Sequence, residues 1–490
     1  MTLNLVKTKY LIIGAGPAAA NAAEAIRKSD PEGKLTIITD EKIPFYSRPL
    51  ITHILSGNTA HDDDNGNNNE LTDKILYRDT AWIKKNRITL ITACKATHID
   101  TSKKIVRTAT PAHHPAIKYD KLLIASGGEP IIPPFLKNPD GKARTFTLTT
   151  IKDAYEIKSA IKKLSDLKHK NNKSAMSGDT IKITIIGAGF IGLKAAEALI
   201  LPPLHHAATT AKGDIPHEIS VIELAPRLLP AMLDKTASNF FEEHLAKHHI
   251  KLYLGETAEG LSPDGKTLIL KSGKKIAADI IISAIGVKPS LNFITDKKIK
   301  TARGIIVDRT MKTSATDVWA AGDVAESANF LLDGEKQPIP IWPLAAKQGA
   351  IAGANMSAKK SDAASFYEGG FPMNSVEVFG LPVISAGITL PSVTDNENSD
   401  DRFLILSRVS LEKKQYKKLV FDTRKKTLAG YILLGGEAIE RAGIYTGLIK
   451  LARTFDDNLE ENALPLLDDN FGFISVGEDT WKKSITPLEA

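Results

Sequence analysis

A glycine-rich turn between an apolar run and an alanine-rich run constrains this chain more than any other feature. It lies within residues 10–20. Gly14 permits a sharp turn, Gly16 lets a phosphate approach the backbone, and Ala19 lets the following helix pack closely on the strand. The free N–H groups at the start of that helix then face the phosphates. The stretch therefore predicts a buried strand, a dinucleotide-binding turn and a helix.

The same pattern occurs a second time, which makes the signal far more specific than one glycine turn. Within residues 183–192 an apolar run is again followed by Gly187, Gly189 and Gly192. Each turn is followed later in the chain by a similar apolar phrase that ends in glycine. Repetition of these parts in the same order indicates duplication of a whole domain. We expect the chain to bind two nucleotides.

Acidic residues follow the second expected strand of each repeat. Asp40 and Glu41 come after the first of these strands, and Glu223 ends the second. An acid at this position accepts hydrogen bonds from the hydroxyls of the adenosine ribose. The alternative interpretation is an acidic residue in a surface turn with no ligand, and we favour the contact with the ribose. Glu223 would also repel the 2′-phosphate of NADP. We therefore favour NAD over NADP, with Arg227 as the residue that argues for the opposite choice.

Composition excludes several classes of protein. No apolar run approaches the ~20 residues that a membrane-spanning helix needs. The single cysteine, Cys94, excludes an intramolecular disulfide, a redox dithiol and a Cys-ligated cluster, and we expect it to be a packed small residue. The net charge of +7 comes from Lys and Arg residues spread along the chain, which indicates a solvated surface. The sequence has no interleaved basic–aromatic pattern, which argues against nucleic-acid binding.

The N-terminus and three polar insertions contain no recognisable catalytic or metal-binding motif. The first expected strand begins within ten residues of Met1, from which we expect no signal peptide and a cytoplasmic protein. Three polar stretches, 58–70, 169–179 and 202–218, read as surface insertions. A calcium site within 62–69 lacks the spacing of an EF-hand loop. We expect no metal site.

Several of these stretches together resemble the FAD-dependent pyridine nucleotide oxidoreductases, which have two dinucleotide-binding domains. Within that family the chain is most similar to the NADH-oxidising group of rubredoxin reductases and nitrite reductases. The resemblance is carried, in family order, by the phrases Gly14–Ala19, Tyr46–Pro49, Ala125–Gly127, Gly187–Gly192, Ala284–Pro289, Ala320–Asp323 and Lys347–Gly349.

The resemblance implies an α/β protein with two Rossmann-like three-layer domains and a C-terminal α+β interface domain. FAD would bind the first domain and NAD(H) the second. The implied order is an FAD domain at 1–150, an NAD domain at 151–294, the rest of the FAD domain at 295–360, the interface domain at 361–455 and a tail at 456–490. The interface domain suggests a homodimer through the C-terminal domain, with a monomer as the open alternative.

The resemblance also implies roles for individual residues. Asp323 would bind the ribityl hydroxyls of FAD, and Arg48 and Pro49 would lie beside the flavin and its phosphates. Gln348 and its helix would approach the isoalloxazine, and Phe190 would gate the nicotinamide pocket. The full set of expected cofactor-binding residues is Gly14, Gly16, Pro17, Ala18, Ala19, Asp40, Glu41, Arg48, Pro49, Ala125, Ser126, Gly127, Gly187, Gly189, Phe190, Ile191, Gly192, Glu223, Gly286, Gly322, Asp323 and Gln348.

Two departures from the family pattern matter for the chemistry. Residues 45–56 contain no cysteine, which excludes thiol–disulfide exchange. Where ferredoxin-reductase-like relatives have a Lys and a Glu that pair, this chain has His53 and Lys194. These two are the candidate catalytic residues. Because neighbouring cations repel, we expect a neutral His53 or a separation of the two groups; an equal alternative places both on ordinary helix surfaces.

The function that follows is transfer of a hydride from NADH to FAD and of electrons to a separate acceptor. Rubredoxin, ferredoxin or a partner subunit of a 2-oxoacid oxidoreductase would fit, and so would oxygen or a small quinone. The alternative is a subunit that binds FAD and NAD as a structural or sensing module with little turnover. A monooxygenase would need a substrate pocket that the sequence does not locate.

Overall fold

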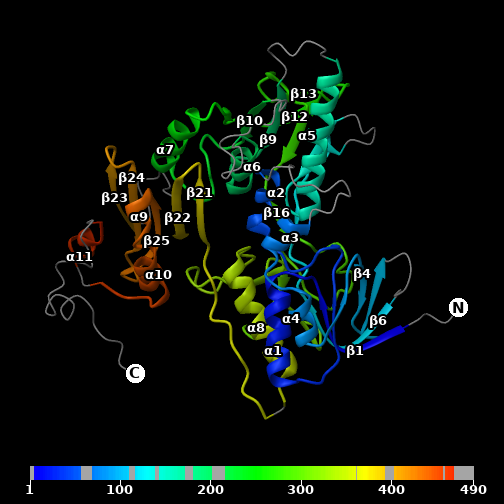
Figure 1. The fold of residues 1–490 in the computed structure, drawn as a ribbon. Helices are drawn as coiled ribbons and strands as arrows, with labels where there is room; N and C mark the ends of the chain where they lie inside the picture. Colours follow the sequence, from blue (N-terminus) through cyan, green and yellow to red (C-terminus); the bar gives the residue numbers. More distant parts are fainter. Residues whose placement is uncertain are drawn as a thin grey trace.

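The computed structural model describes residues 5–56, 69–109, 116–137, 143–171, 180–200, 216–359, 361–391, 402–455 and 458–467. These ranges form two nucleotide-binding-type units and a third unit beside them (Figure 1). Most of each of the three polar insertions lies outside the described residues, as do residues 62–68 of the calcium hypothesis and the part of the tail after residue 467.

The first unit is built on a sheet in the order β3-β2-β1-β6-β5-β4, with β18 also paired to β6. Strands β1, β2, β3 and β18 run parallel to their neighbours in it, whereas β4 and β5 are antiparallel. The strands are β1 (Leu5–Ile13), β2 (Leu35–Ile38), β3 (Ile88–Ile91), β4 (Lys95–Asp100), β5 (Ile105–Ala109), β6 (Ala116–Ile124) and β18 (Val318–Ala320). Because β18 comes after the second unit in the sequence, this sheet joins two distant segments of the chain.

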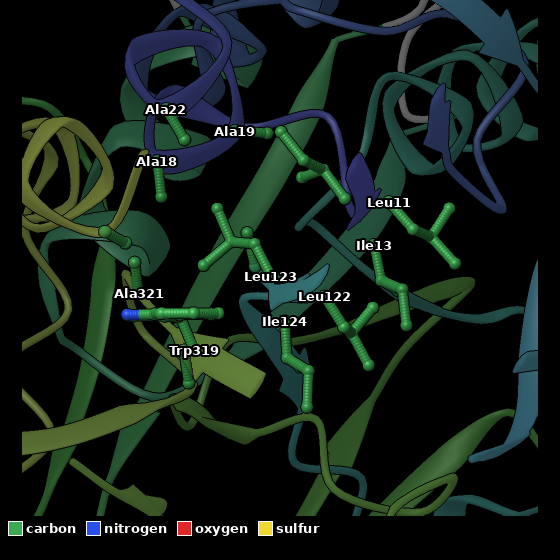
Figure 2. Close-up of a cluster of buried hydrophobic side chains, with 14 of the residues drawn as sticks. Leu11, Ile13, Ala18, Ala19, Ala22, Leu122, Leu123, Ile124, Trp319 and Ala321 are labelled. Carbon is green, nitrogen blue, oxygen red and sulfur yellow. The ribbon is translucent and has the colours of Figure 1, made fainter. Parts of the chain in front are cut away.

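Helices α1 (Pro17–Ser29) and α8 (Trp342–Ser357) pack tightly against each other in the first unit. A Cβ atom on Gly349 would lie 2.1 Å from the carbonyl oxygen of Ala18, and one on Gly353 would lie 2.3 Å from that of Ala22. Figure 2 shows the alanines of α1 beside the apolar side chains of β1, β6 and β18. Small residues on both helices therefore let the helices approach and cover the sheet.

The second unit repeats this design with the order β11-β10-β9-β15-β8, all parallel. Its elements are β8 (Thr145–Thr147), α5 (Ile151–Asn171), β9 (Ile181–Ile186), α6 (Phe190–Ile200), β10 (His217–Glu223), α7 (Lys235–Ala246), β11 (Lys251–Leu254) and β15 (Ile280–Ser283). A small antiparallel sheet of β12 (Ala258–Leu261), β13 (Thr267–Leu270) and β14 (Lys275–Ala277) is attached. Strand β8 lies before residue 150, so the second sheet begins earlier than the boundary expected from the sequence.

The two glycine turns have the same backbone geometry. Gly14 has φ 106° and Gly187 has φ 105°. A Cβ atom on Gly14 would lie 2.1 Å from the carbonyl oxygen of Ala125, and one on Gly187 would lie 2.5 Å from that of Ala284. Glycine is therefore required at both turns, by its positive φ and by close contact with the neighbouring strand. The internal repeat predicted from the sequence is confirmed.

Several short elements connect the two units. The described residues 43–56 and 69–76 follow the first sheet, and Ile51 and Ile54 from this segment lie in the hydrophobic core of the second unit. The elements of the connection are η1 (Arg48–Leu50), α2 (Thr52–Ser56), α3 (Asn69–Ile75), β7 (Gly128–Pro130), η3 (Pro134–Leu136) and β16 (Val287–Pro289). Helix α4 (Thr80–Lys85) and the small sheet of β17 (Ile305–Ile306), β19 (Ala325–Ala328) and β20 (Lys336–Gln337) lie on the first unit, whose core includes Ile305 and Ala325. Strands β7 and β16 pair with each other, which joins the units a second time.

The third unit is an antiparallel sheet in the order β21-β22-β25-β24-β23 with short helices. Its elements are β21 (Met373–Val378), β22 (Leu381–Gly387), β23 (Phe403–Ser410), β24 (Gln415–Asp422), β25 (Thr427–Leu434), α9 (Gly436–Ile439), α10 (Ala442–Lys450), α11 (Leu459–Ala463) and η4 (Leu464–Leu467). Phe379 and Val383 share a hydrophobic core with the second unit. The carboxylate of Asp234 in the second unit also accepts a hydrogen bond from the hydroxyl of Tyr416, at 2.7 Å.

The expected α/β class with two Rossmann-like units is confirmed. Within the described ranges, every helix is too short or too polar to cross a membrane.

Candidate nucleotide-binding and redox site

A cavity of about 1450 Å³ lies where the three units meet. Its lining includes residues 13–18 of the first glycine turn and Gly187, Gly189 and Phe190 of the second. The third unit contributes Asn374. Nucleotides seated on the two turns would therefore occupy one continuous space, in which their reactive rings can meet.

The first glycine turn presents an open backbone to this cavity. A Cβ atom on Gly16 would have no protein atom within 4 Å. Pro17 occupies the first turn of α1, and no side chain caps the helix at Gly16. The backbone N–H groups of that first turn are therefore left for a ligand, and the positive end of the helix dipole favours a phosphate there.

Glu41, Tyr46 and Arg48 form a hydrogen-bonded group in the cavity wall. The Glu41 carboxylate accepts from the Arg48 guanidinium at 2.6 Å and from the Tyr46 hydroxyl. Burial raises the pKa of Tyr46, so its hydroxyl keeps its proton and donates. Arg48 also donates to the carbonyl of Thr149. Glu41 is thus the partner of Arg48, while Asp40 beside it is exposed and also lines the cavity.

Asp323 follows β18 and faces the same part of the cavity. Its carboxyl is half-buried, and burial raises its pKa, although the positive charge of Arg48 opposes that rise. Pro49 and residues 125–127 line this part of the cavity as well. The residues expected around the first nucleotide are therefore brought together, except for Ala19, which is fully buried in the core of the first unit, and Gln348.

Gln348 is buried away from the cavity. Its side chain is 2% exposed and does not line the cavity. The side-chain oxygen accepts from the backbone N–H of Gly322 at 2.9 Å, and the side-chain nitrogen donates to the Ser327 hydroxyl at 3.1 Å. Gln348 therefore holds the turn that carries Asp323, in place of the expected approach to the isoalloxazine. Trp342 and Ala345 of the same helix line the cavity instead.

Cys94 is 1% exposed and packs in the core of the first unit at the cavity wall. Burial raises the pKa of its thiol. A protonated, buried thiol is a poor nucleophile, which agrees with the expected role of a packed small residue.

The second glycine turn is held by Glu223. The Glu223 carboxylate is 9% exposed and accepts from the backbone N–H groups of Ala188 at 2.7 Å and Ala225 at 2.8 Å. It also lines the cavity, as do Ile191 and Gly286. Because each carboxylate oxygen has more than one lone pair, Glu223 can hold the turn and still accept from a ribose hydroxyl.

Close packing at the start of α6 completes the second turn. A Cβ atom on Gly192 would lie 2.0 Å from the carbonyl oxygen of Gly187, whereas one on Gly189 would meet nothing within 4 Å. The Phe190 side chain is 40% exposed and lines the cavity. Gly189 is therefore the open position and Gly192 the packing position, as the motif predicts.

His53 and Lys194, the candidate catalytic residues, lie on α2 and α6, two helices that contact each other. His53 is exposed and does not line the cavity. Lys194 lines it, and its ammonium pairs with the Glu197 carboxylate on the same helix. Lys194 also donates to the backbone carbonyl of Glu377 at 3.1 Å. Glu197 is therefore the acid that balances the charge of Lys194, and the expected separation of His53 from Lys194 stays a prediction.

Sequence reasoning overlooked Glu197 and Asn374. The Lys194–Glu197 spacing of three residues on a helix is the signal for the first, because such residues face each other. Asn374 has no local signal, since it reaches the cavity only through the docking of the third unit.

A family model described as pyridine nucleotide-disulphide oxidoreductase matches residues 8–349. The chain belongs to this family. Pyridine nucleotide-disulphide oxidoreductases bind FAD and pyridine nucleotide, and the two open glycine turns of this chain fit two dinucleotides. The chain is accordingly a flavoprotein oxidoreductase, although it lacks the cysteines from which the family takes its name.

Individual family members are similar over most of their length. The chain is 33% identical to an NADH-rubredoxin oxidoreductase of Clostridium acetobutylicum over 402 residues. The matched region covers 81% of this chain and 87% of that protein. It is 30% identical over 385 residues to the epsilon subunit of an NADH-dependent phenylglyoxylate dehydrogenase of Aromatoleum evansii, covering 78% of this chain and 79% of the subunit.

Solved structures agree with this placement. An NAD-dependent persulfide reductase from A. fulgidus superposes with a TM-score of 0.74 at 26% identity, over 94% of this chain and 79% of that one. The crystal structure of the C. acetobutylicum NADH:rubredoxin oxidoreductase gives 0.63 at 27% identity, over 92% of this chain and 97% of that one.

Replacing Asp323 with alanine is expected to weaken FAD retention by roughly tenfold or more, because a carboxylate that accepts from ligand hydroxyls contributes about 1.5–3 kcal/mol. The fraction of flavin that remains bound after dialysis measures the effect. Asp317→Ala serves as the control, since Asp317 ion-pairs with Lys104 and does not line the cavity. Full retention of FAD by Asp323→Ala would remove Asp323 from the binding site.

Proposed function

We propose that this protein oxidises NADH and passes the electrons through FAD to a separate acceptor. The observation that carries the proposal is the single cavity onto which both glycine turns open. One hydride, with its two electrons, would pass from the nicotinamide of NADH to FAD, and NAD⁺ would leave. The protein contributes approach and orientation, and the redox chemistry belongs to the cofactors.

The choice of NADH over NADPH rests on two side chains. Glu223 places a carboxylate in the cavity wall beside the second turn. Arg227, which argued for NADPH, donates its guanidinium N–H groups to the backbone carbonyls of Leu233 and Pro230, each at 3.0 Å. Arg227 does not line the cavity. A 2′-phosphate would therefore meet a negative charge and no positive partner from Arg227.

Replacing Glu223 with alanine should lower the ratio of kcat/KM for NADH to that for NADPH by about tenfold, the equivalent of one charged hydrogen bond. Steady-state kinetics with both nucleotides and an artificial electron acceptor measure this ratio. Arg227→Ala is the matched control and should leave the ratio within a factor of about two. If Arg227→Ala shifts the ratio and Glu223→Ala does not, Arg227 reads the ribose.

The acceptor is proposed to be a small iron–sulfur or rubredoxin-type protein, or the partner subunit of a larger oxidoreductase. Relatives named for rubredoxin and for a phenylglyoxylate dehydrogenase subunit support this. The chain has one cysteine, which is buried, so a thiol of its own does not relay the electrons. We place the reaction in the cytoplasm, where NADH is available.

Anaerobic titration of the purified protein with NADH, and separately with NADPH, tests the proposal. NADH should bleach the flavin absorbance with one equivalent per flavin, and addition of rubredoxin or ferredoxin should restore it. Bound flavin that neither nucleotide reduces would contradict the proposal and favour the alternative, a structural or sensing subunit.

A further inference from the structure

Lys194 gives the nicotinamide part of the cavity a positive charge. The basic side chains among the described residues that line the cavity are Arg48, Lys95 and Lys194. Arg48 is paired with Glu41, and Lys95 begins β4 in the first unit. On the second unit, the lining cation is therefore Lys194.

The position of Lys194 relative to a bound pyridine nucleotide follows from the second turn. The pyrophosphate of the nucleotide lies on the turn at Gly189, and the adenosine half lies toward Glu223. The nicotinamide half must then extend the other way, along the wall that Phe190, Ile191 and Lys194 form. Lys194 therefore stands on the nicotinamide side of the pyrophosphate.

Two anchors fix the Lys194 ammonium. Glu197 pairs with it but does not line the cavity. A nucleotide in the cavity would therefore lie closer to the ammonium of Lys194 than to the carboxylate of Glu197. The second anchor is the backbone carbonyl of Glu377, on β21 of the third unit, at 3.1 Å. The side chain of Lys194 is 29% exposed and that of Glu197 12%, which leaves the charge only partly screened by solvent.

The third unit is itself held at this point. The backbone N–H of Phe379 donates to the Glu197 carboxylate at 2.5 Å, and the Phe379 carbonyl bonds to the His244 imidazole at 2.8 Å. The Phe379 ring stacks on His248 with 4.1 Å between centroids and 20° between planes. The turn between β21 and β22 is thus fixed between α6 and α7 (Figure 1), and Glu197 joins it to Lys194.

The charge of the nicotinamide ring changes during the reaction. The ring is neutral in NADH and positive in NAD⁺. A fixed cation beside the ring therefore disfavours the oxidised nucleotide by Coulomb repulsion and leaves the reduced one unaffected.

We infer that Lys194 is a specificity-determining residue that makes the site bind NADH more tightly than NAD⁺, so that the oxidised nucleotide leaves before the acceptor arrives, and that Glu197 is its positioning residue. This inference rests on the proposed function. It also gives a reason for a cation at the place where ferredoxin-reductase-like relatives have an acid, since an acid there would attract the NAD⁺ ring.

Equilibrium binding to the oxidised, FAD-loaded protein tests the inference without any turnover. The two ligands are NAD⁺ and tetrahydro-NAD, whose ring is neutral and cannot donate a hydride. Calorimetry gives both dissociation constants, and their ratio cancels effects on the shared adenosine and pyrophosphate. We expect the native protein to bind tetrahydro-NAD at least about tenfold more tightly than NAD⁺, a repulsion of about 1.4 kcal/mol.

Variants then assign the ratio to Lys194. Lys194→Met should reduce the preference for the neutral ring to within about twofold, and Lys194→Arg should retain it. Glu197→Gln, which removes the counter-charge, should increase it. The matched control is Lys152→Met on α5, which breaks an exposed Lys–Glu helix pair outside the cavity, with 3.6 Å between Lys152 and Glu156, and should leave the ratio unchanged.

An unchanged ratio in Lys194→Met, or loss of the preference in Lys194→Arg, would overturn the inference. If Lys194→Met does not fold, the opposite signs expected for Glu197→Gln and for the charge reversal Lys194→Glu still decide it. Failure of the proposed function appears separately, as flavin that NADH does not bleach, because the binding ratio involves no hydride transfer.

Discussion

Replacing Gly16 with valine is expected to give a folded but colourless protein. A Cβ atom on Gly16 would meet no protein atom within 4 Å, so the chain itself accommodates a side chain there. The isopropyl group would instead fill the space at the N-terminus of α1 where a pyrophosphate must lie against the backbone. We expect at least a hundredfold loss of FAD affinity, about 2.7 kcal/mol, measured by the flavin absorbance per protein after gel filtration.

Gly189→Val is the matched variant in the second turn, where a Cβ atom likewise meets nothing within 4 Å. It should remain yellow, because the FAD site is intact, but its flavin should no longer be bleached by NADH at concentrations that reduce the native protein. Circular dichroism shows that both variants fold. A yellow Gly16→Val protein, or a colourless Gly189→Val protein, would mean that the two turns are assigned to the wrong nucleotides.

Replacing Gly349 with alanine should destabilise the first unit by about 3 kcal/mol, the upper part of the range for overpacked cores. The added Cβ atom would lie 2.1 Å from the backbone oxygen of Ala18, so α1 and α8 must separate. Because Gln348 beside it holds the turn of Asp323, flavin should also dissociate at a lower temperature. Thermal unfolding and flavin fluorescence measure the two effects.

Gly447→Ala controls for the general effect of a methyl group in a helix. Gly447 lies in α10, and its added Cβ atom would meet nothing within 4 Å. Alanine is favoured over glycine in a helix by roughly 0.5–1 kcal/mol, so this variant should be slightly more stable than the native protein. Equal unfolding temperatures for the Gly349 and Gly447 variants would show that α1 and α8 tolerate a wider separation.

The features that were predictable from sequence are local in the chain. A glycine turn, its flanking strand and its helix lie within a few residues of one another. The motifs at Gly14 and Gly187 therefore predict the two nucleotide-binding units from the sequence alone. Strand β22 (Leu381–Gly387) has no comparable local signal, because it has a Pro near its start and ends in small residues.

The parts of the site that sequence reasoning misplaced depend on contacts between distant residues. Gln348 was expected at the isoalloxazine, but Gly322 and Ser327 lie close enough to use its whole amide. For Lys194 the sequence indicated only a cation that should stay away from a charged His53. Its two partners, the carboxylate of Glu197 and the carbonyl of Glu377 on the docked third unit, were not foreseen. A pattern of single residues records which groups are available, and the tertiary fold decides which of them meet.

The placement of β18 in the first sheet has a consequence for biosynthesis. Residues 318–320 pair with β6 next to the first glycine turn, and Asp323 and Gln348 follow them. During synthesis the chain emerges from its N-terminus, so the sheet of the first unit stays incomplete until the whole second unit has been made. The second unit, whose strands come from one uninterrupted segment, can fold earlier. Acquisition of FAD is therefore a late event, and a ribosome that stalls before residue 318 releases a fragment with a complete NAD-type fold but no complete flavin site.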